Sequence, residues 1–60
     1  MIYHLRVVLG LTQKRLADLL GVHLMTVWRW EAGRVAPHGP ARLLLAQLDE
    51  QARLVDSANR

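Results

Sequence analysis

Cysteine and phenylalanine are both missing from this 60-residue chain, and proline occurs only twice. Without cysteine, the chain can form neither a disulfide nor a thiolate metal site. Its three histidines, His4, His23 and His38, lie far apart and lack the spacing of a zinc motif, so we expect no metal and no cofactor. A chain this short buries only about 60% of its unfolded surface, which leaves oligomerisation as the obvious source of extra stability.

Long hydrophobic runs are absent as well. Hydrophobic residues make up 52% of the chain, yet no run approaches the ~20 apolar residues of a membrane span. The first residues, MIYHLRVVLGL, contain one arginine and no small-residue cleavage site, which argues against a signal peptide. We therefore expect one cytoplasmic domain over residues 1–60, with no membrane partner and no small-molecule ligand.

Charge is distributed unevenly along the chain. Residues 1–42 carry six basic side chains against two acidic ones, a net of +4, whereas residues 43–60 carry two against three, a net of −1. A basic front with a mildly acidic tail is typical of a nucleic-acid-binding face joined to a separate arm.

Helical spacing of apolar residues predicts an all-α fold, and no strand pattern competes with it. The first helix is expected from Met1 to Leu9 and ends at Gly10. The second is expected to begin after an N-cap at Thr12 and to end at Gly21. The residues expected to face the core from these two helices are Ile2, Leu5, Leu9, Leu16, Leu19 and Leu20.

Two further helices follow. The third is expected from Leu24 to Ala32, after His23, which is a poor N-cap. The fourth should run from about Pro40 to Val55, roughly 24 Å at ~1.5 Å per residue, so its C-terminal turns are expected to project beyond a core of this size. Its predicted apolar stripe comprises Leu44, Leu45, Leu48, Ala52 and Val55.

Seven positions in one frame predict a helix-turn-helix. Counting from Gln13 as the first position, Ala17 is the fifth, Gly21 the ninth and Val27 the fifteenth. Such a motif needs a small residue where its helices touch, glycine where the turn has φ > 0, and apolar residues where both helices meet the core. The apolar residues stand at the fourth, eighth, tenth and eighteenth positions, namely Leu16, Leu20, Val22 and Trp30.

In this frame the chain resembles the Cro/repressor-type (XRE-like) helix-turn-helix regulators of phages, plasmids and bacterial chromosomes. The matching residues are LR at 5–6, GLTQ at 10–13, LA at 16–17, LGV at 20–22, TV at 26–27, WE at 30–31, Gly33, Pro37 and the leucine-rich stretch Leu43 to Leu48. The resemblance implies a lambda-repressor-like bundle of about four helices, with the last helix extended in place of the family's short fifth one. The chain departs from the family at three positions. His23 stands where the family usually has a serine or threonine cap, and Leu24 and Met25 stand where polar base-reading residues are common.

The resemblance also implies that Arg6 pairs with Glu31. Glu31 follows the core residue Trp30, and a half-buried carboxylate there needs a cation. We expect this pair to hold the fold and not to catalyse a reaction. The chain has no nucleophile–base arrangement, no phosphate-binding glycine loop and no paired carboxylates on one face, so we do not expect an enzyme.

The third helix should carry a face that the core cannot use, because Trp28 lies about 200° around the helix from Trp30. The DNA interpretation places this face in the major groove, where Arg29 contacts guanine. The other expected base contacts, to thymine methyls or sugar edges, are Trp28, Met25 and Leu24. In the rival interpretation, the apolar patch of those three residues docks on a protein partner, as in an antitoxin.

Phosphate contacts are expected around this face, although a solvated side chain is the alternative for Gln13 and Arg15. The expected set is Gln13, His23, Thr26, Arg34 and Arg15. These features together predict a repressor, of phage or plasmid type by resemblance, that binds duplex DNA as a homodimer on a pseudo-palindromic operator. The candidate dimer residues lie in or next to a C-terminal extension over residues 49–60 and are Leu48, Ala52, Leu54 and Val55.

Overall fold

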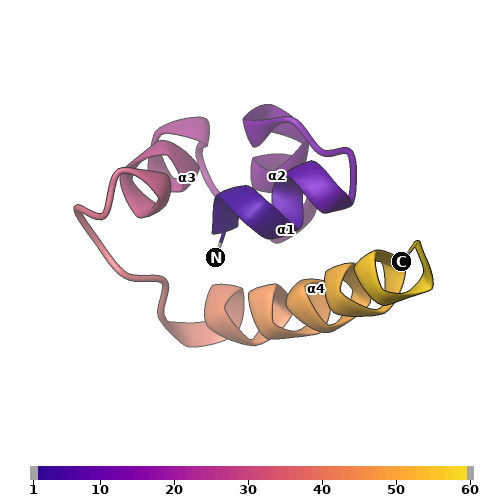
Figure 1. The fold of residues 1–60 in the computed structure, drawn as a ribbon. Helices are drawn as coiled ribbons and strands as arrows, with labels where there is room; N and C mark the ends of the chain where they lie inside the picture. Colours follow the sequence, from indigo (N-terminus) through magenta and orange to yellow (C-terminus); the bar gives the residue numbers. More distant parts are fainter. Residues whose placement is uncertain (1, 60) are drawn as a thin grey trace.

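The computed structural model describes residues 2–59, so Met1, where the first helix was expected to begin, and Arg60 lie outside the described residues. Within that range there are four helices and no strand: α1 (Ile2–Val8), α2 (Gln13–Leu20), α3 (Leu24–Glu31) and α4 (Gly39–Ala58). Figure 1 shows α1, α2 and α3 grouped together, with α4 running beneath them. The predicted all-α class, with about four helices and a long last one, is confirmed.

The turn between α2 and α3 has the geometry that the sequence predicts. The Thr12 hydroxyl accepts a hydrogen bond from the backbone N–H of Arg15 at 3.0 Å and so caps α2. Gly21 takes a φ of 69°, the left-handed conformation that side chains disfavour, and it ends the helix. The backbone N–H of Val22 then donates to the Ala17 carbonyl at 3.0 Å. These bonds fix the angle at which α3 leaves α2.

The core takes residues from all four helices. Leu5, Leu16, Val27 and Leu45 are its largest fully buried side chains, one from each helix. Val22, in the turn, packs against this cluster from its edge. The remaining members are Ile2, Ala17, Leu20, Trp30 and Ala52. The apolar positions of the predicted helix-turn-helix frame and its small residue Ala17 therefore serve the core, whereas Gly21 is exposed and serves the turn.

Two of the leucines expected to face inward, Leu19 and Leu44, are exposed, so these predictions are wrong. Val55, at the far end of the predicted stripe and one of the candidate dimer residues, is exposed as well. On α4, Leu45 and Ala52 lie seven residues apart on one line that faces inward, and Leu44 is about 100° away from that line. A core this small covers only a narrow arc of each helix, so the neighbouring apolar positions remain outside.

The expectation that the C-terminal turns of α4 project is wrong up to Ala52, whereas beyond it most of the described residues are exposed. The helix packs mainly on α1, and Ala52 is only 2% exposed. α1 lies along α4 and not across its end (Figure 1), so α4 has a longer surface on which to pack. Ala52 therefore serves this chain's own core and offers no surface to a second copy. Leu48, another candidate dimer residue, is partly buried against the same core.

None of the helices within residues 2–59 combines the length and apolar composition needed to cross a membrane.

Candidate nucleic-acid interface

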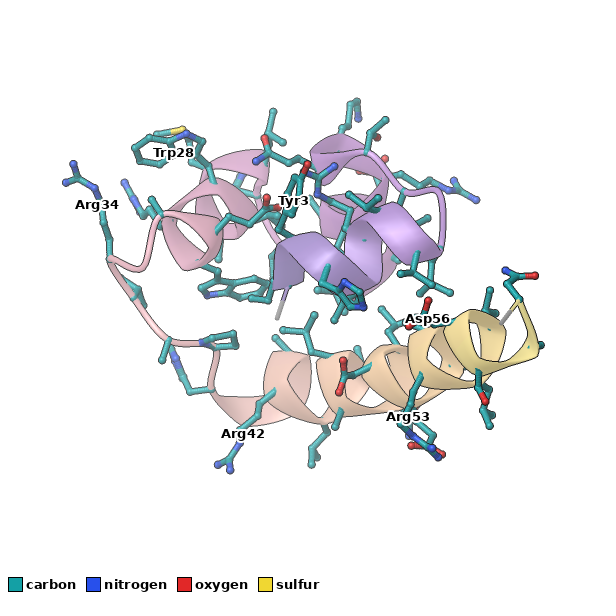
Figure 2. All side chains as sticks on the ribbon, viewed as in Figure 1. Tyr3, Trp28, Arg34, Arg42, Arg53 and Asp56 are labelled. Carbon is teal, nitrogen blue, oxygen red and sulfur yellow. The ribbon has the colours of Figure 1, made fainter. Side chains whose placement is uncertain are left out.

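The outward face of α3 consists of side chains that the core leaves out. Val27 and Trp30 point inward and are buried, which turns the opposite side of the helix to solvent. There Leu24, Met25 and Trp28 are between 43% and 54% exposed. Figure 2 shows Trp28 on the outer side of α3, away from α4. Exposed apolar side chains gathered on one face are typical of a contact surface.

Arg29 lies on the same face and is exposed. Its side chain makes no hydrogen bond, ion pair or ring contact with any of residues 2–59. It occupies the last turn of α3, where a cation interacts favourably with the helix dipole. Its five N–H donors are therefore available to a ligand.

Trp28 and Arg34 form a cation–π contact at the C-terminal end of α3. The guanidinium carbon of Arg34 lies 5.6 Å from the centre of the Trp28 ring, and Figure 2 shows the two side chains next to each other. Gly33, with a φ of 74°, turns the chain back, and the Arg34 N–H donates to the Arg29 carbonyl at 2.9 Å. The turn thereby carries a second cation to the edge of the α3 face.

The contact between Trp28 and Arg34 was not predicted from the sequence, in which the two residues had separate expected roles. A signal for it was present in the sequence. A glycine at a helix end returns the chain toward the preceding turn, so the residue after Gly33 comes close to the last turn of α3.

The other expected phosphate-contacting residues are spread around this region. Gln13 is the first residue of α2, and Arg15, two residues later, is exposed. His23 precedes α3 as its N-cap and forms no side-chain cap bond there. Thr26 lies off the outward face: it is half-buried beside Trp30 and lines a hollow of about 400 Å³ toward the start of α4. Lys14, which was not among the expected contacts, pairs with Asp18 at 3.3 Å.

Arg6 and Glu31 form a bidentate ion pair between α1 and the end of α3. Arg6 Nε lies 3.0 Å from Glu31 Oε2, and Arg6 Nη2 lies 3.1 Å from Oε1. The third nitrogen, Nη1, donates to the Leu11 carbonyl at 3.1 Å, and the guanidinium also lies over the Tyr3 ring. The side chains are 16% and 11% exposed, so the pair holds α3 in place from the inner side.

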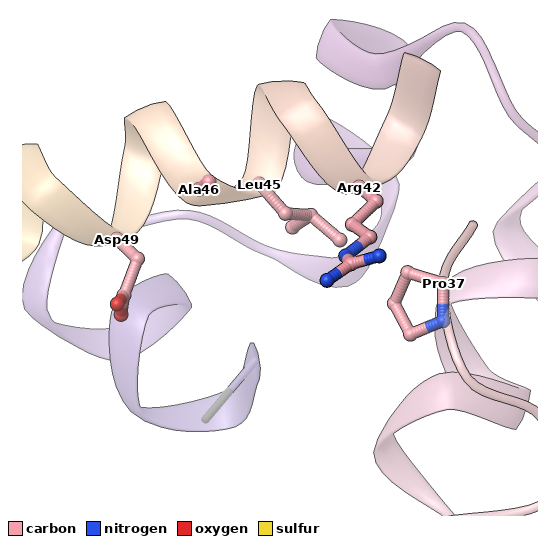
Figure 3. Close-up of a pocket in the computed structure, with 5 residues that line it drawn as sticks. All are labelled: Pro37, Arg42, Leu45, Ala46 and Asp49. Carbon is pink, nitrogen blue, oxygen red and sulfur yellow. The ribbon is translucent and has the colours of Figure 1, made fainter. Parts of the chain in front are cut away.

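A separate hollow of about 310 Å³ opens between the loop before α4 and α4 itself. Figure 3 shows Pro37 and the Arg42 side chain on its two sides. Leu45, Ala46 and Asp49 complete its lining, and none of the outward residues of α3 takes part. Residues 2–59 also contain no group of three or more His, Cys, Asp or Glu side chains that could hold a metal ion.

Residues 1–44 match the family model described as a homeodomain-like domain. Since this match covers more than half of the chain, the chain belongs to that helix-turn-helix, DNA-binding family. No curated protein and no solved structure matches the chain. The family match includes α1, α2, α3 and the first turns of α4, so the face described above lies entirely within it.

Proposed function

We propose that this chain is a transcriptional repressor of the Cro/repressor type, which binds a pseudo-palindromic DNA operator as a homodimer. The observation that carries the proposal is the outward face of α3, where Arg29, which has no partner among residues 2–59, stands among exposed apolar side chains. The family scaffold supplies the reason to expect duplex DNA opposite that face. The resemblance to the Cro/repressor type points to the cytoplasm of a prokaryotic or phage-infected cell.

Arg29 is the proposed base reader. A free guanidinium can donate two parallel hydrogen bonds to guanine O6 and N7, worth about 1–3 kcal/mol of discrimination against other bases. Leu24, Met25 and Trp28 have no polar group suited to that pattern, apart from the indole N–H. They are proposed to contact thymine methyls and sugar edges, which are the apolar features of the major groove.

Phosphate contacts are proposed to position α3 in the groove. Gln13 stands at the N-terminus of α2, where free backbone N–H groups favour an anion. The Trp28 ring holds Arg34 at the edge of the outward face of α3, which we call the reading face. Binding of a phosphate to the N–H groups of Arg34 therefore costs little side-chain entropy. The rest of the proposed phosphate-contacting set is Arg15, His23 and Thr26.

A homodimer is proposed because one domain of this size makes few base contacts. Two copies related by a two-fold axis would read two half-sites about 34 Å apart, or roughly 10 bp, which corresponds to one turn of the duplex. The proposed role is binding alone, with no catalytic step.

A protein-interaction module is the second candidate. It is favoured by one specific observation: three large apolar side chains, Leu24, Met25 and Trp28, are exposed together on α3. Such a patch also suits an apolar groove on a partner protein, as in an antitoxin.

Selection of duplex DNA from a random pool by the purified full chain, followed by sequencing, tests the proposal. We expect enrichment of an inverted repeat with half-sites roughly 10 bp apart. Fluorescence anisotropy on the selected duplex should then show affinity that falls steeply as salt rises, because phosphate contacts release counterions. A chain that enriches no sequence and binds duplexes without salt dependence would instead favour the protein-interaction module.

A further inference from the structure

One side of α4 carries no charged residue. Leu44, Gln47, Gln51 and Leu54 are all exposed, and at about 100° per residue they fall within an arc of roughly 80°. We call these four residues the α4 seam. The charged residues of the helix lie on its other sides; Figure 2 shows Arg42 and Arg53 pointing away from the other three helices and Asp56 toward them. At its two ends the seam is apolar, with Leu44 39% and Leu54 56% exposed.

The residue types and spacings of the α4 seam are the same from either end of the helix. Its spacings are three, four and three residues, and its residue types run Leu, Gln, Gln, Leu. Spacings of three and four are those of the contact positions in paired helices. When two identical helices pack antiparallel about a two-fold axis near residue 49, Leu44 meets Leu54 of the second copy and Gln47 meets Gln51. Each residue then opposes one of its own type.

The seam borders a second exposed feature, on α2. A hollow of about 140 Å³ separates the end of α2 from α4, and Leu19 stands exposed at its rim. Three seam residues line this hollow, so a helix seated on the seam would lie over it and cover part of Leu19. The residues that line the hollow are Leu19, Leu20, Leu44, Gln47, Leu48 and Gln51.

We propose that the chain forms its homodimer by antiparallel packing of α4 on α4 of a second copy along the α4 seam. This deepens the proposed function and rests on it in one respect, namely that the regulator acts as a dimer. An isologous interface requires a self-complementary surface, and a palindromic seam without charge meets that requirement. The seam shares only Leu54 with the dimer residues expected from the sequence.

The two glutamines set the register of the pair. A glutamine amide both donates and accepts, so Gln47 and Gln51 of opposite copies can bond to each other. A polar residue within an apolar helix contact fixes one register, because every other register leaves it unpaired. The nearest charge, Glu50, lies at the rim and is held by Arg53, whose Nε donates to it at 3.1 Å. It therefore adds little repulsion across the axis.

Disulfide crosslinking of single-cysteine variants tests the antiparallel register, since the chain has no native cysteine. Gln47→Cys and Gln51→Cys are each oxidised alone and then as an equimolar mixture of the full chains. We expect the mixture to crosslink at least tenfold faster than either variant alone. Equal or faster crosslinking of each variant alone indicates a parallel pair or another surface, and overturns the proposal. Arg53→Cys, on the charged side of the helix, is the control and should stay uncrosslinked.

Charge placed in the seam gives a second, independent measurement by sedimentation velocity. The double variant Gln47→Lys/Gln51→Lys sets cations opposite cations and should raise the dimer Kd at least tenfold. Gln47→Glu/Gln51→Lys sets Glu opposite Lys and should return the Kd to near that of the parent chain. Lysine and glutamate have helix propensities close to that of glutamine, so helical content by circular dichroism should be equal in both variants. Equal Kd values in both variants, or a monomeric parent chain, would overturn the proposal.

The same two variants separate this inference from the proposed function. A single half-site duplex needs only one copy, so both variants should bind it with the affinity of the parent chain. If half-site binding persists while the parent chain is monomeric, the seam proposal fails and the DNA proposal stands. If the parent chain dimerises as described but binds no duplex, the DNA proposal fails and the seam proposal stands.

Discussion

Both α3 and α4 expose large apolar side chains, but they differ in the charges beside them. On α3, Arg29 and Arg34 stand at the end of the apolar face, and neither has an anionic partner within residues 2–59. On the α4 seam there is no charge, and the polar groups are two amides. The apolar area alone would not tell the two faces apart. The cations suit the α3 face to a polyanion such as DNA. The uncharged seam suits α4 to the same helix of a second copy.

The two faces also depend on the core in different ways. The reading face of α3 is oriented by Val27, Trp30 and the Arg6–Glu31 pair, all on or next to its inner side. The seam of α4 is oriented by Leu45 and Ala52, which fix the helix on α1. Since Arg6 also belongs to α1, that one helix supports both faces. Damage to it should remove both, whereas damage to either face should spare the other.

The largest effect is expected from Glu31→Ala, which leaves Arg6 nearly buried without its anion. Breaking such a pair costs about 3 kcal/mol of the free energy of unfolding. In a domain this small, that loss lowers Tm by on the order of 10–20 °C. Thermal unfolding by circular dichroism measures it. DNA binding and dimerisation should then disappear together at the lower temperature. An unchanged Tm would show that the pair does not hold the fold.

The next effect should come from the reading face alone. Arg29→Ala should reduce the preference for the selected operator over a mutated one by about 1–3 kcal/mol, or roughly 5- to 150-fold. Arg34→Ala should weaken binding to both duplexes equally and reduce the slope of log K against log salt by about 0.9 for the lost phosphate contact. Anisotropy titrations on the two duplexes at several salt concentrations measure both quantities.

Arg42→Ala serves as the matched control for these arginine variants, because it removes an exposed cation from α4, outside the α4 seam, and not from α3. It should leave operator preference and salt slope unchanged. If neither Arg29→Ala nor Arg34→Ala alters duplex binding, the comparison between the two faces is wrong, and the α3 face belongs to a protein partner.

A smaller effect is expected from the ring beneath Arg34. Trp28→Leu keeps an apolar side chain but removes the cation–π contact, which is worth about 0.5–1 kcal/mol at an exposed site. We therefore expect a two- to fivefold loss of duplex affinity, whereas Trp28→Phe should retain most of it. In the Arg34→Ala background the same Trp28→Leu change should cost less, since the cation is gone. An equal cost in both backgrounds would mean that Trp28 acts on DNA directly.

The fold was readable from the sequence because its constraints are local. Thr12 and Gly21 mark helix ends by their own chemistry, and the spacing of Leu16, Val27 and Trp30 defines the inner faces of α2 and α3. The Arg6–Glu31 pair was inferred from the family resemblance and from the need of a half-buried carboxylate for a cation. The helix ends and inner faces each depend on one residue or on the spacing within a helix, whereas the Arg6–Glu31 pair joins residues 25 apart and needed the family resemblance.

The errors concern how helices pack on one another. Periodicity places Leu44 and Leu45 in one apolar band of α4, and only the position of α1 decides that Leu45 is inside. For the same reason, the sequence could not show that Ala52 is buried in its own chain. The Trp28–Arg34 contact depends on the return of the chain after Gly33, which the glycine signals in the sequence, and on the position of the Arg34 side chain over the ring, which only the structure gives.

The smallest effect should come from the charged side of α4. The side-chain hydrogen bond and charge of Arg53 hold the pKa of Glu50 below its ordinary value of 4.5. The folded-state pKa is thus lowered, so the pair contributes stability above the unfolded-state pKa and loses it as pH falls through the folded-state value. Both groups are fully exposed, so the contribution is small. Glu50→Gln should therefore give a slightly smaller fall in Tm between pH 7 and pH 3 than the parent chain does.

Dimerisation and operator binding of the Glu50→Gln variant at pH 7 should equal those of the parent chain, because Glu50 lies at the rim of the α4 seam and far from α3 in the sequence. A large rise in the dimer Kd would place Glu50 inside the interface and shift the two-fold axis from its position near residue 49. A stronger dimer would mean that the two Glu50 side chains repel each other across the axis, despite the Arg53 partner that each one has. Either result would correct the register of the helix pair, whereas an unchanged Kd restricts the contact to the uncharged side of α4.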